Sequence, residues 1–137
     1  MSTSLTVHPR TGRLCVQSPA PWEPIVGYSR AVRSGPFIAV TGTVGREEDG
    51  SYADSAGQQA RRALVIILAA LKSLGAGPEH VLRTRMFVTD ITTWEQVAAA
   101  HREVFAAIRP ATTLVEVSRL IDPQALIEIE ADAFVPT

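Results

Sequence analysis

The sequence predicts an α+β fold in which a single sheet carries two helices on one face. Two long segments, residues 55–74 and 92–109, repeat apolar side chains at the three- and four-residue spacing of an amphipathic helix. The segments around them alternate apolar and polar side chains, with the two-residue period of a half-buried strand. The expected order is strands, helix, strand, helix and two strands, which favours a two-layer sandwich.

The first half of the chain is predicted to form four strands, at residues 4–7, 13–17, 28–33 and 36–43. Residues 8–12 are expected to form the turn between the first two strands. Three prolines in residues 17–24 indicate an extended connector. Residues 1–20 are weakly patterned and the sequence has no internal repeat, so we expect one domain over residues 1–137.

Both predicted helices carry start signals. Asp54 or Ser55 can cap the first helix, and Gly75 lies where that helix is expected to end. In the second helix, Thr92 and Glu95 have the spacing of a capping box, in which the glutamate reaches back to the backbone of the cap. Three further strands are predicted at residues 81–89, 112–117 and 125–135.

The last predicted strand separates two kinds of side chain. The apolar set, expected to lie under the helices, is Ile127, Ile129, Ala131, Ala133 and Val135. The other face carries Glu128, Glu130 and Asp132, and these carboxylates can simply face water, as on many antiparallel sheets. Alternatively, they meet Arg83 and Arg85 of a neighbouring strand on a face that is partly buried against another copy of the chain. We expect this self-association because two helices cannot cover both faces.

Composition excludes several classes of protein. Hydrophobic residues make up 46% of the 137 residues and charged residues 20%, which rules against disorder. A formal net charge of −1 offers no basic surface for nucleic acid or an anionic membrane. The single Cys15 excludes an intrachain disulfide, and the longest apolar run, residues 63–71, is far shorter than the roughly 20 residues of a membrane span. Without a signal-peptide pattern in residues 1–13, we expect a cytoplasmic protein.

Common catalytic signatures are missing from the sequence. The three histidines, His8, His80 and His101, lack the spacing of metal ligands, so no metal site is expected. Glu128 and Glu130 lie on the same face of one predicted strand, about 7 Å apart. A carboxylate there can act as a general base or can belong to a solvated strand face, and spacing alone does not separate the two roles.

Groups of residues in four regions follow the order of a known family. They are residues 27–32 with 38–43, residues 59–64 with 74–76, residues 85–90, and residues 110–117 with 126–131. From about residue 17 to residue 135, without large insertions, the chain resembles the RidA family, also called YjgF or L-PSP endoribonuclease.

The resemblance implies a chorismate-mutase-like sandwich and a homotrimer that holds small molecules in three clefts between subunits. RidA proteins are best known as deaminases that hydrolyse reactive enamines and imines, such as 2-aminoacrylate, to a keto acid and ammonia. They use neither a metal nor an organic cofactor. The residues indicated for this chain are the catalytic pair Glu128 and Tyr28 and the ligand-binding set Thr41, Gly42, Trp94, Thr112, Leu114 and Arg30.

This chain departs from the family motif at its central arginine, which binds the substrate carboxylate through two hydrogen bonds. Thr112 takes its place, and Ala98 replaces an asparagine of the cleft. Loss of a charge-assisted bidentate contact costs about 2–5 kcal/mol at a desolvated site. We therefore expect poor activity on 2-aminoacrylate-type acids, with Arg30 as a candidate for the missing charge.

Other interpretations of these residues stay open at this level. Tyr28 can pack at a sheet edge, Trp94 can anchor a helix, and Arg30 can form an ion pair inside the assembly. A non-catalytic trimer that binds a small metabolite or regulates a partner is the alternative to a hydrolase. An endoribonuclease is less favoured, because the chain lacks a basic stripe and a histidine pair for in-line cleavage.

Overall fold

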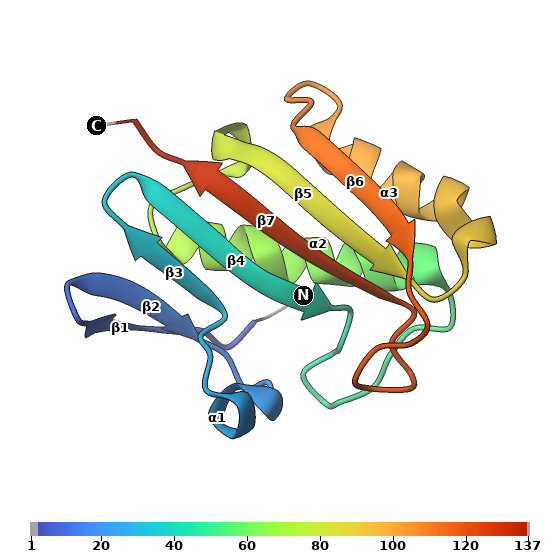
Figure 1. Cartoon of the computed structure of the whole chain (residues 1–137), viewed down its shortest axis with the longest axis horizontal. Helices are drawn as coiled ribbons and strands as arrows, with labels where there is room; N and C mark the ends of the chain where they lie inside the picture. Colours follow the sequence, from blue (N-terminus) through green and yellow to red (C-terminus); the bar gives the residue numbers. More distant parts are fainter. Residues whose placement is uncertain (1–2, 137) are drawn as a thin grey trace.

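The computed structural model describes residues 3–136 as one seven-stranded mixed sheet with two long helices on one face (Figure 1). The strands are β1 (Thr6–Arg10), β2 (Arg13–Gln17), β3 (Ala31–Ser34), β4 (Phe37–Val44), β5 (Val81–Val88), β6 (Ala111–Glu116) and β7 (Ile127–Phe134). Their order across the sheet is β1-β2-β3-β4-β7-β5-β6, and of these neighbouring pairs only β5 and β6 run parallel. The predicted α+β fold is confirmed.

The helices are α1 (Trp22–Val26), α2 (Ala56–Ser73) and α3 (Trp94–Phe105), with short 3₁₀ turns η1 (Pro78–His80) and η2 (Ile91–Thr93). The hydroxyl of Ser55 accepts a hydrogen bond from the backbone N–H of Gln58 and caps α2. After α2, Gly75 adopts the left-handed conformation with φ of +81°, which costs glycine little. The predicted limits of this helix are confirmed.

The core lies between α2, α3 and the covered face of the sheet. Ile127, Ile129, Ala131 and Ala133 of β7 are only 0–2% exposed, as the alternation of this strand predicts. Leu64, Ile67 and Leu71 of α2 are equally buried and belong to the same apolar cluster. Because β7 is central, its apolar side chains contribute to the middle of the core.

The N-terminal segment differs from the prediction. β1 extends to Arg10, and the turn consists of Thr11 and Gly12, with φ of 49° and 76°. Pro9 is tolerated within β1 because this strand lies at the edge of the sheet, where a missing N–H breaks no ladder. The two positive φ values are those of the tight hairpin turns that match strand twist.

The predicted extended connector at residues 17–24 is wrong at its end, where α1 begins. Pro24 lies in the first turn of α1, where backbone N–H groups have no partner within the helix. Gly27, with φ of 89°, then closes the helix by donating its N–H to the carbonyl of Glu23. Tyr28 also donates to this carbonyl, so β3 starts at Ala31 and not at the predicted residue 28.

The predicted capping box at Thr92 and Glu95 is wrong. The carboxylate of Asp90 accepts hydrogen bonds from the N–H and hydroxyl of Thr92 and caps η2. The α3 helix follows η2 directly, and its cap residue Thr93 makes no side-chain capping bond. A short acidic side chain two residues upstream competes successfully for the same backbone.

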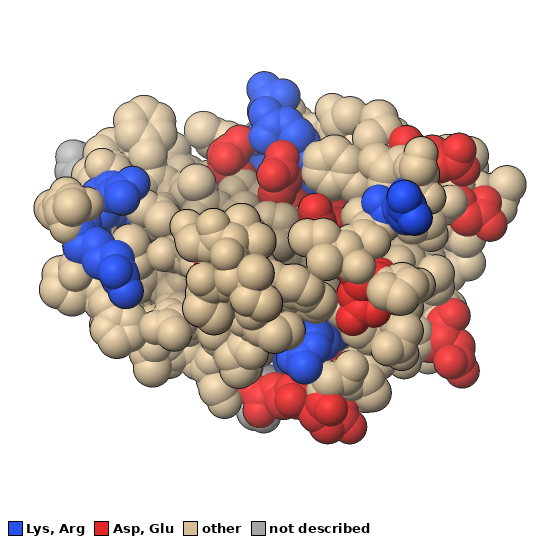
Figure 2. Space-filling view, turned by 60° about the horizontal axis from the view of Figure 1, so that its bottom comes forward, with Lys and Arg blue, Asp and Glu red and all other residues tan. Residues whose placement is uncertain are grey.

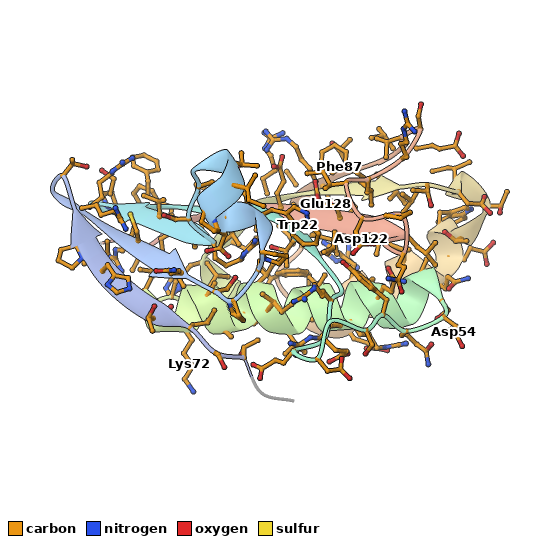
Figure 3. All side chains as sticks on the ribbon, turned by 90° about the horizontal axis from the view of Figure 1, so that it is seen from below. Trp22, Asp54, Lys72, Phe87, Asp122 and Glu128 are labelled. Atoms are coloured by element: carbon orange, nitrogen blue, oxygen red, sulfur yellow. The ribbon has the colours of Figure 1, made fainter. Side chains whose placement is uncertain are left out.

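We call the sheet face turned away from α2 and α3 the open face. Glu128 and Phe87 lie on it, and α1 rises on this side, opposite to α2 (Figure 3). Arg85 forms ion pairs there with Glu130 and Asp132, at 3.2 and 3.3 Å. The predicted meeting of opposite charges on neighbouring strands is confirmed for Arg85, whereas Arg83 forms no ion pair with residues 3–136. Among residues 3–136, no helix combines the length and apolarity needed to cross a membrane.

Candidate active site

Glu128 occupies the open face of the central strand β7. Its backbone is paired with Val44 of β4 and with Phe87 of β5. Its carboxylate lies against Gly42, where an added Cβ would come within 2.7 Å of Oε2. Glycine at position 42 is therefore required for this position of the carboxylate, since any larger side chain would displace it.

A β-bulge creates the space beside this carboxylate. The register between β4 and β7 shifts between Val40 and Thr43, which removes Thr41 and Gly42 from the ladder. The hydroxyl of Thr41 instead donates to the carbonyl of Ser29, at 2.6 Å. Bulges re-aim side chains and are common next to active sites.

Arg30 is a buried guanidinium, 4% exposed, behind the bulge. Its Nη1 donates to the carbonyl of Gly42 at 2.8 Å and to the hydroxyl of Thr43 at 3.1 Å. Its Nη2 donates to the phenol oxygen of Tyr28 at 3.3 Å and pairs with the carboxylate of Glu23 at 3.4 Å. Both terminal nitrogens are thus engaged by protein groups, so Arg30 holds the bulge, α1 and Tyr28 together.

Burial raises the pKa of Glu128 above its ordinary value. Arg30 acts in the opposite direction and the carboxylate of Glu130 adds to the rise, but burial is the largest of the three effects. A carboxylate whose pKa is raised takes up a proton more readily near neutral pH than a solvated one. This property suits a general acid or base.

Two hollows meet at Tyr28. The smaller, of about 80 Å³, is lined by Glu128, Arg30 and Gly42, together with Trp22 and Asp122, which Figure 3 shows beside Glu128. The larger, of about 560 Å³, lies between the β1–β2 hairpin and α1. Thr41 lines this larger hollow, and Tyr28 lines the two hollows.

The structure brings five of the eight predicted site residues together, namely Tyr28, Arg30, Thr41, Gly42 and Glu128. The other three lie elsewhere in the same chain. Thr112 and Leu114 are on the edge strand β6, which is separated from β4 by two strands, or about 14 Å. Trp94 begins α3 and is 50% exposed.

Thr112 lies in a chain of hydrogen bonds on the covered side of the sheet. Its hydroxyl is 2.6 Å from that of buried Thr84, which is 2.8 Å from Nε2 of His101 on α3. Burial lowers the pKa of His101. Sequence reasoning missed Thr84, although a threonine at an inward position of an apolar strand marks a buried polar group.

Sequence reasoning also missed Glu23, which is 3% exposed and binds both Arg30 and the hydroxyl of Ser18. Its only signal was an acidic residue between prolines. Among residues 3–136, no three His, Cys, Asp or Glu side chains gather to hold a metal ion.

The family model described as Endoribonuclease L-PSP matches residues 17–135. The chain belongs to this family. Among its relatives, an uncharacterized Streptomyces coelicolor protein is 35% identical over 120 residues, covering 87% of this chain and 90% of the relative. The 2-iminobutanoate/2-iminopropanoate deaminase of Salmonella typhimurium is 30% identical, covering 77% and 85%.

Solved structures agree with the family and with the fold. Rv2704 of Mycobacterium tuberculosis, a member of the YjgF/YER057c/UK114 family, is 46% identical, with a TM-score of 0.83 over 90% of this chain and 99% of that one. The YjgF gene product of Escherichia coli is 29% identical, with a TM-score of 0.73 over 78% and 87%. Membership of this L-PSP family supports a role as a small-molecule deaminase, hydrolase or binding protein.

Proposed function

We propose that this chain is a cofactor-independent hydrolase of C=N bonds in small metabolites, with Glu128 as its general base. The observation that carries this proposal is the half-buried carboxylate of Glu128, whose pKa is raised, on the wall of a hollow that also contains Tyr28. Hydrolysis of an imine needs a group that first removes a proton from water and later returns it to the leaving nitrogen.

In the proposed reaction, the imine nitrogen is protonated, as it is for a basic imine in water, and Glu128 accepts a proton from a water molecule whose oxygen bonds to the imine carbon. The product of this step is a tetrahedral carbinolamine. Protonated Glu128 then donates this proton to the amino nitrogen, the C–N bond breaks so that its electron pair leaves on ammonia, and the hydroxyl proton passes to solvent as the carbonyl forms. The balance is one imine and one water to one carbonyl compound and one ammonia.

Tyr28 is proposed to orient the substrate. Its phenol oxygen accepts a hydrogen bond from Arg30, so the phenol hydrogen is available to donate to a ligand. Thr41 and Gly42 of the bulge complete this wall. Arg30 supports the wall from behind, because its terminal nitrogens are already bound to protein groups.

The second wall of the cleft is proposed to come from another copy in a homotrimer. Within one chain, Thr112 bonds to Thr84 on the covered side of the sheet, and Trp94, Thr112 and Leu114 line neither hollow. They are on or near the edge strand β6, whose backbone is open for contact with a neighbour. Family membership supports an oligomer of this kind.

Thr112 sets the expected substrate preference of this cleft. Its hydroxyl is neutral and already bonded to Thr84, so it cannot balance the charge of a carboxylate. We therefore propose low activity on 2-aminoacrylate and 2-iminopropionate, in which the carboxylate adjoins the reacting carbon. The same feature favours a second candidate, a trimer that binds a small molecule in this cleft without catalysis.

The test uses imines generated in situ by an amino acid oxidase from a panel of amino acids. We expect Glu128→Gln to lower kcat by about 10²–10⁴-fold on the best substrate while the trimer persists in light scattering. Thr112→Arg is expected to increase activity on 2-iminopropionate. Unchanged kcat in Glu128→Gln would contradict the proposed base, and ligand binding without turnover in the wild type would favour the second candidate.

A further inference from the structure

We propose that the β1–β2 hairpin is an anion-binding site, in which Arg10 and Arg13 bind an acidic group that is remote from the reacting carbon of the substrate. The inference deepens the proposed function, on which it rests for the identity of the reacting group. Anion binding by the hairpin is measurable without any activity.

The strand pairing places a row of polar side chains on one face of the hairpin. Cross-strand partners share a face, and so do residues two apart along a strand. The row is Thr6, His8, Arg10, Arg13, Cys15 and Gln17. Cys15 pairs with Val32 and Val32 pairs with Ala39, so this row continues into the open face that carries Thr41.

Arg10 and Arg13 are direct cross-strand neighbours on either side of the turn. Their Cβ atoms are therefore about 5 Å apart, and like charges at this spacing destabilise a hairpin. Among residues 3–136, neither side chain has an ion-pair or hydrogen-bond partner. An oxyanion placed between the two guanidinium groups would relieve the repulsion and accept hydrogen bonds from both.

Within the described part of the chain, no carboxylate that lines the larger hollow is free to neutralise this pair. The carboxylate of Glu23, which lines this hollow, is already bound to Arg30 and Ser18. In Figure 2 the end of the molecule that the hairpin forms, at the left, shows basic side chains without acidic ones, and acidic side chains gather toward the opposite end. The hollow is thus a locally basic site on a chain whose net charge is −1.

The size and position of the hollow define the ligand. A volume of about 560 Å³ is that of a pocket for a whole small molecule. β2 is three strands away from β7, so the arginines act roughly 14 Å or more from Glu128, with Tyr28 between them. The substrate class is therefore an imine or enamine that bears a carboxylate or phosphate several bonds from the C=N carbon.

The two arginines are a feature of this chain outside the matched family region. The family match begins at residue 17, and Arg10 and Arg13 lie before it. They supply positive charge at one end of the cleft, in a chain that has Thr112 where the family motif has an arginine. In the proposed site, the protein therefore binds the negative charge of the substrate at the end remote from the reacting carbon, and not beside that carbon.

The test is calorimetric titration of the full chain with two probes, inorganic phosphate and glutarate, in a buffer of low ionic strength without other oxyanions. The double variant Arg10→Gln/Arg13→Gln is compared with Lys72→Gln/Arg102→Gln, which removes the same charge from two exposed positions on α2 and α3, outside the hollow and away from the open face. We expect the wild type to bind at least one probe and the hairpin variant to raise Kd about 10-fold or more. The control should change Kd less than twofold.

The choice between probes identifies the acidic group, since preference for phosphate indicates a phosphorylated substrate and preference for glutarate a carboxylate. Failure of both probes to bind the wild type would overturn the inference. The inference would also be overturned if the fold-increase in Kd of the hairpin variant were less than about five times that of the control variant. The hairpin variant should melt at or above the wild-type temperature, because it lacks the like-charge pair.

Glu128→Gln separates this inference from the proposed function. It should bind the same probe with unchanged Kd, because Glu128 lies outside the larger hollow. If Glu128→Gln retained full activity and the hairpin variant lost anion binding, the base assignment would fail and the anion site would stand.

Discussion

The two faces of β7 show how one strand serves stability and chemistry at once. On the covered face, its alternate residues from Ile127 to Ala133 are almost fully buried in apolar contact. On the open face, Glu128, Glu130 and Asp132 remain half-buried among charged and polar groups. Because the core lies on the covered face alone, we expect substitutions of the polar groups on the open face to leave the core packing intact.

Arg30 is the exception to this division, because it is as buried as a core residue although it belongs to the site. Its ion pair with Glu23 and its hydrogen bonds to the bulge make the wall of the cleft depend on a buried charge. Substitutions on the two faces of β7 and at Arg30 test whether the residues that stabilise the fold are separate from those that form the site.

The largest effect on stability is expected for Arg30→Gln. It leaves the buried carboxylate of Glu23 without its cation, and breaking such a pair costs about 3–5 kcal/mol. Urea denaturation measures the free energy of unfolding. The control Glu23→Gln/Arg30→Gln should lose less than Arg30→Gln, because no unpaired charge remains, and an equal or larger loss would contradict this explanation.

Ile129→Val is expected to have a smaller effect, a loss of about 0.5–1.5 kcal/mol. The substitution removes one methylene from a side chain that is fully buried under the helices. Denaturation should show this loss with little change in ligand binding, since Ile129 faces away from the cleft. Val115→Ala on the exposed edge strand is the comparison, and a larger loss there would break the distinction between the faces.

Arg85→Gln should lower the free energy of unfolding of one subunit by less than about 1 kcal/mol. Its ion pairs with Glu130 and Asp132 are substantially exposed, so water and salt screen them. We expect a larger effect on assembly, because the open face is proposed to contact other copies. Light scattering over a dilution series measures it, and an unchanged assembly would contradict a place for Arg85 in the proposed interface.

Glu128→Gln is expected to change stability least, and the size of the change should depend on pH. Burial raises the pKa of Glu128 in the folded chain, so its contribution is fully present below the unfolded pKa and is lost as pH rises through the folded pKa. The variant should therefore melt higher than wild type at pH 8 and nearly equal to it at pH 4. An equal rise in melting temperature at pH 8 and at pH 4 would contradict the explanation that burial raises the pKa of Glu128.

The position of Glu128 on the open face could be predicted from the sequence, and so could the residues that form the core. Both follow from the two-residue period of a strand and the 3.6-residue period of a helix, which are local properties. The place of Tyr28, Thr41 and Gly42 near Glu128 came from the resemblance to RidA proteins, and the structure brings these residues together.

The partners of Arg30 could not be predicted in this way. They join residues such as Glu23 and Gly42 that lie on different elements, and the bulge at Thr41 and Gly42 leaves no mark in the alternation of β4. The same holds for the hydrogen bonds from Thr112 to Thr84, which lie 28 residues apart. Such contacts depend on how strands pair across the sheet.

The two long helices, most of the strands and the two faces of β7 thus follow from local sequence patterns, because the environment of each residue in those elements depends on its near neighbours in the chain, whereas α1 does not follow from such patterns. Only the tertiary structure decided that Arg30 is a buried support, that α1 covers a hollow, and that Arg10 and Arg13 face the same hollow as Tyr28. These outcomes depend on burial and charge contacts between distant segments, whose free energies exist only after the sheet has formed.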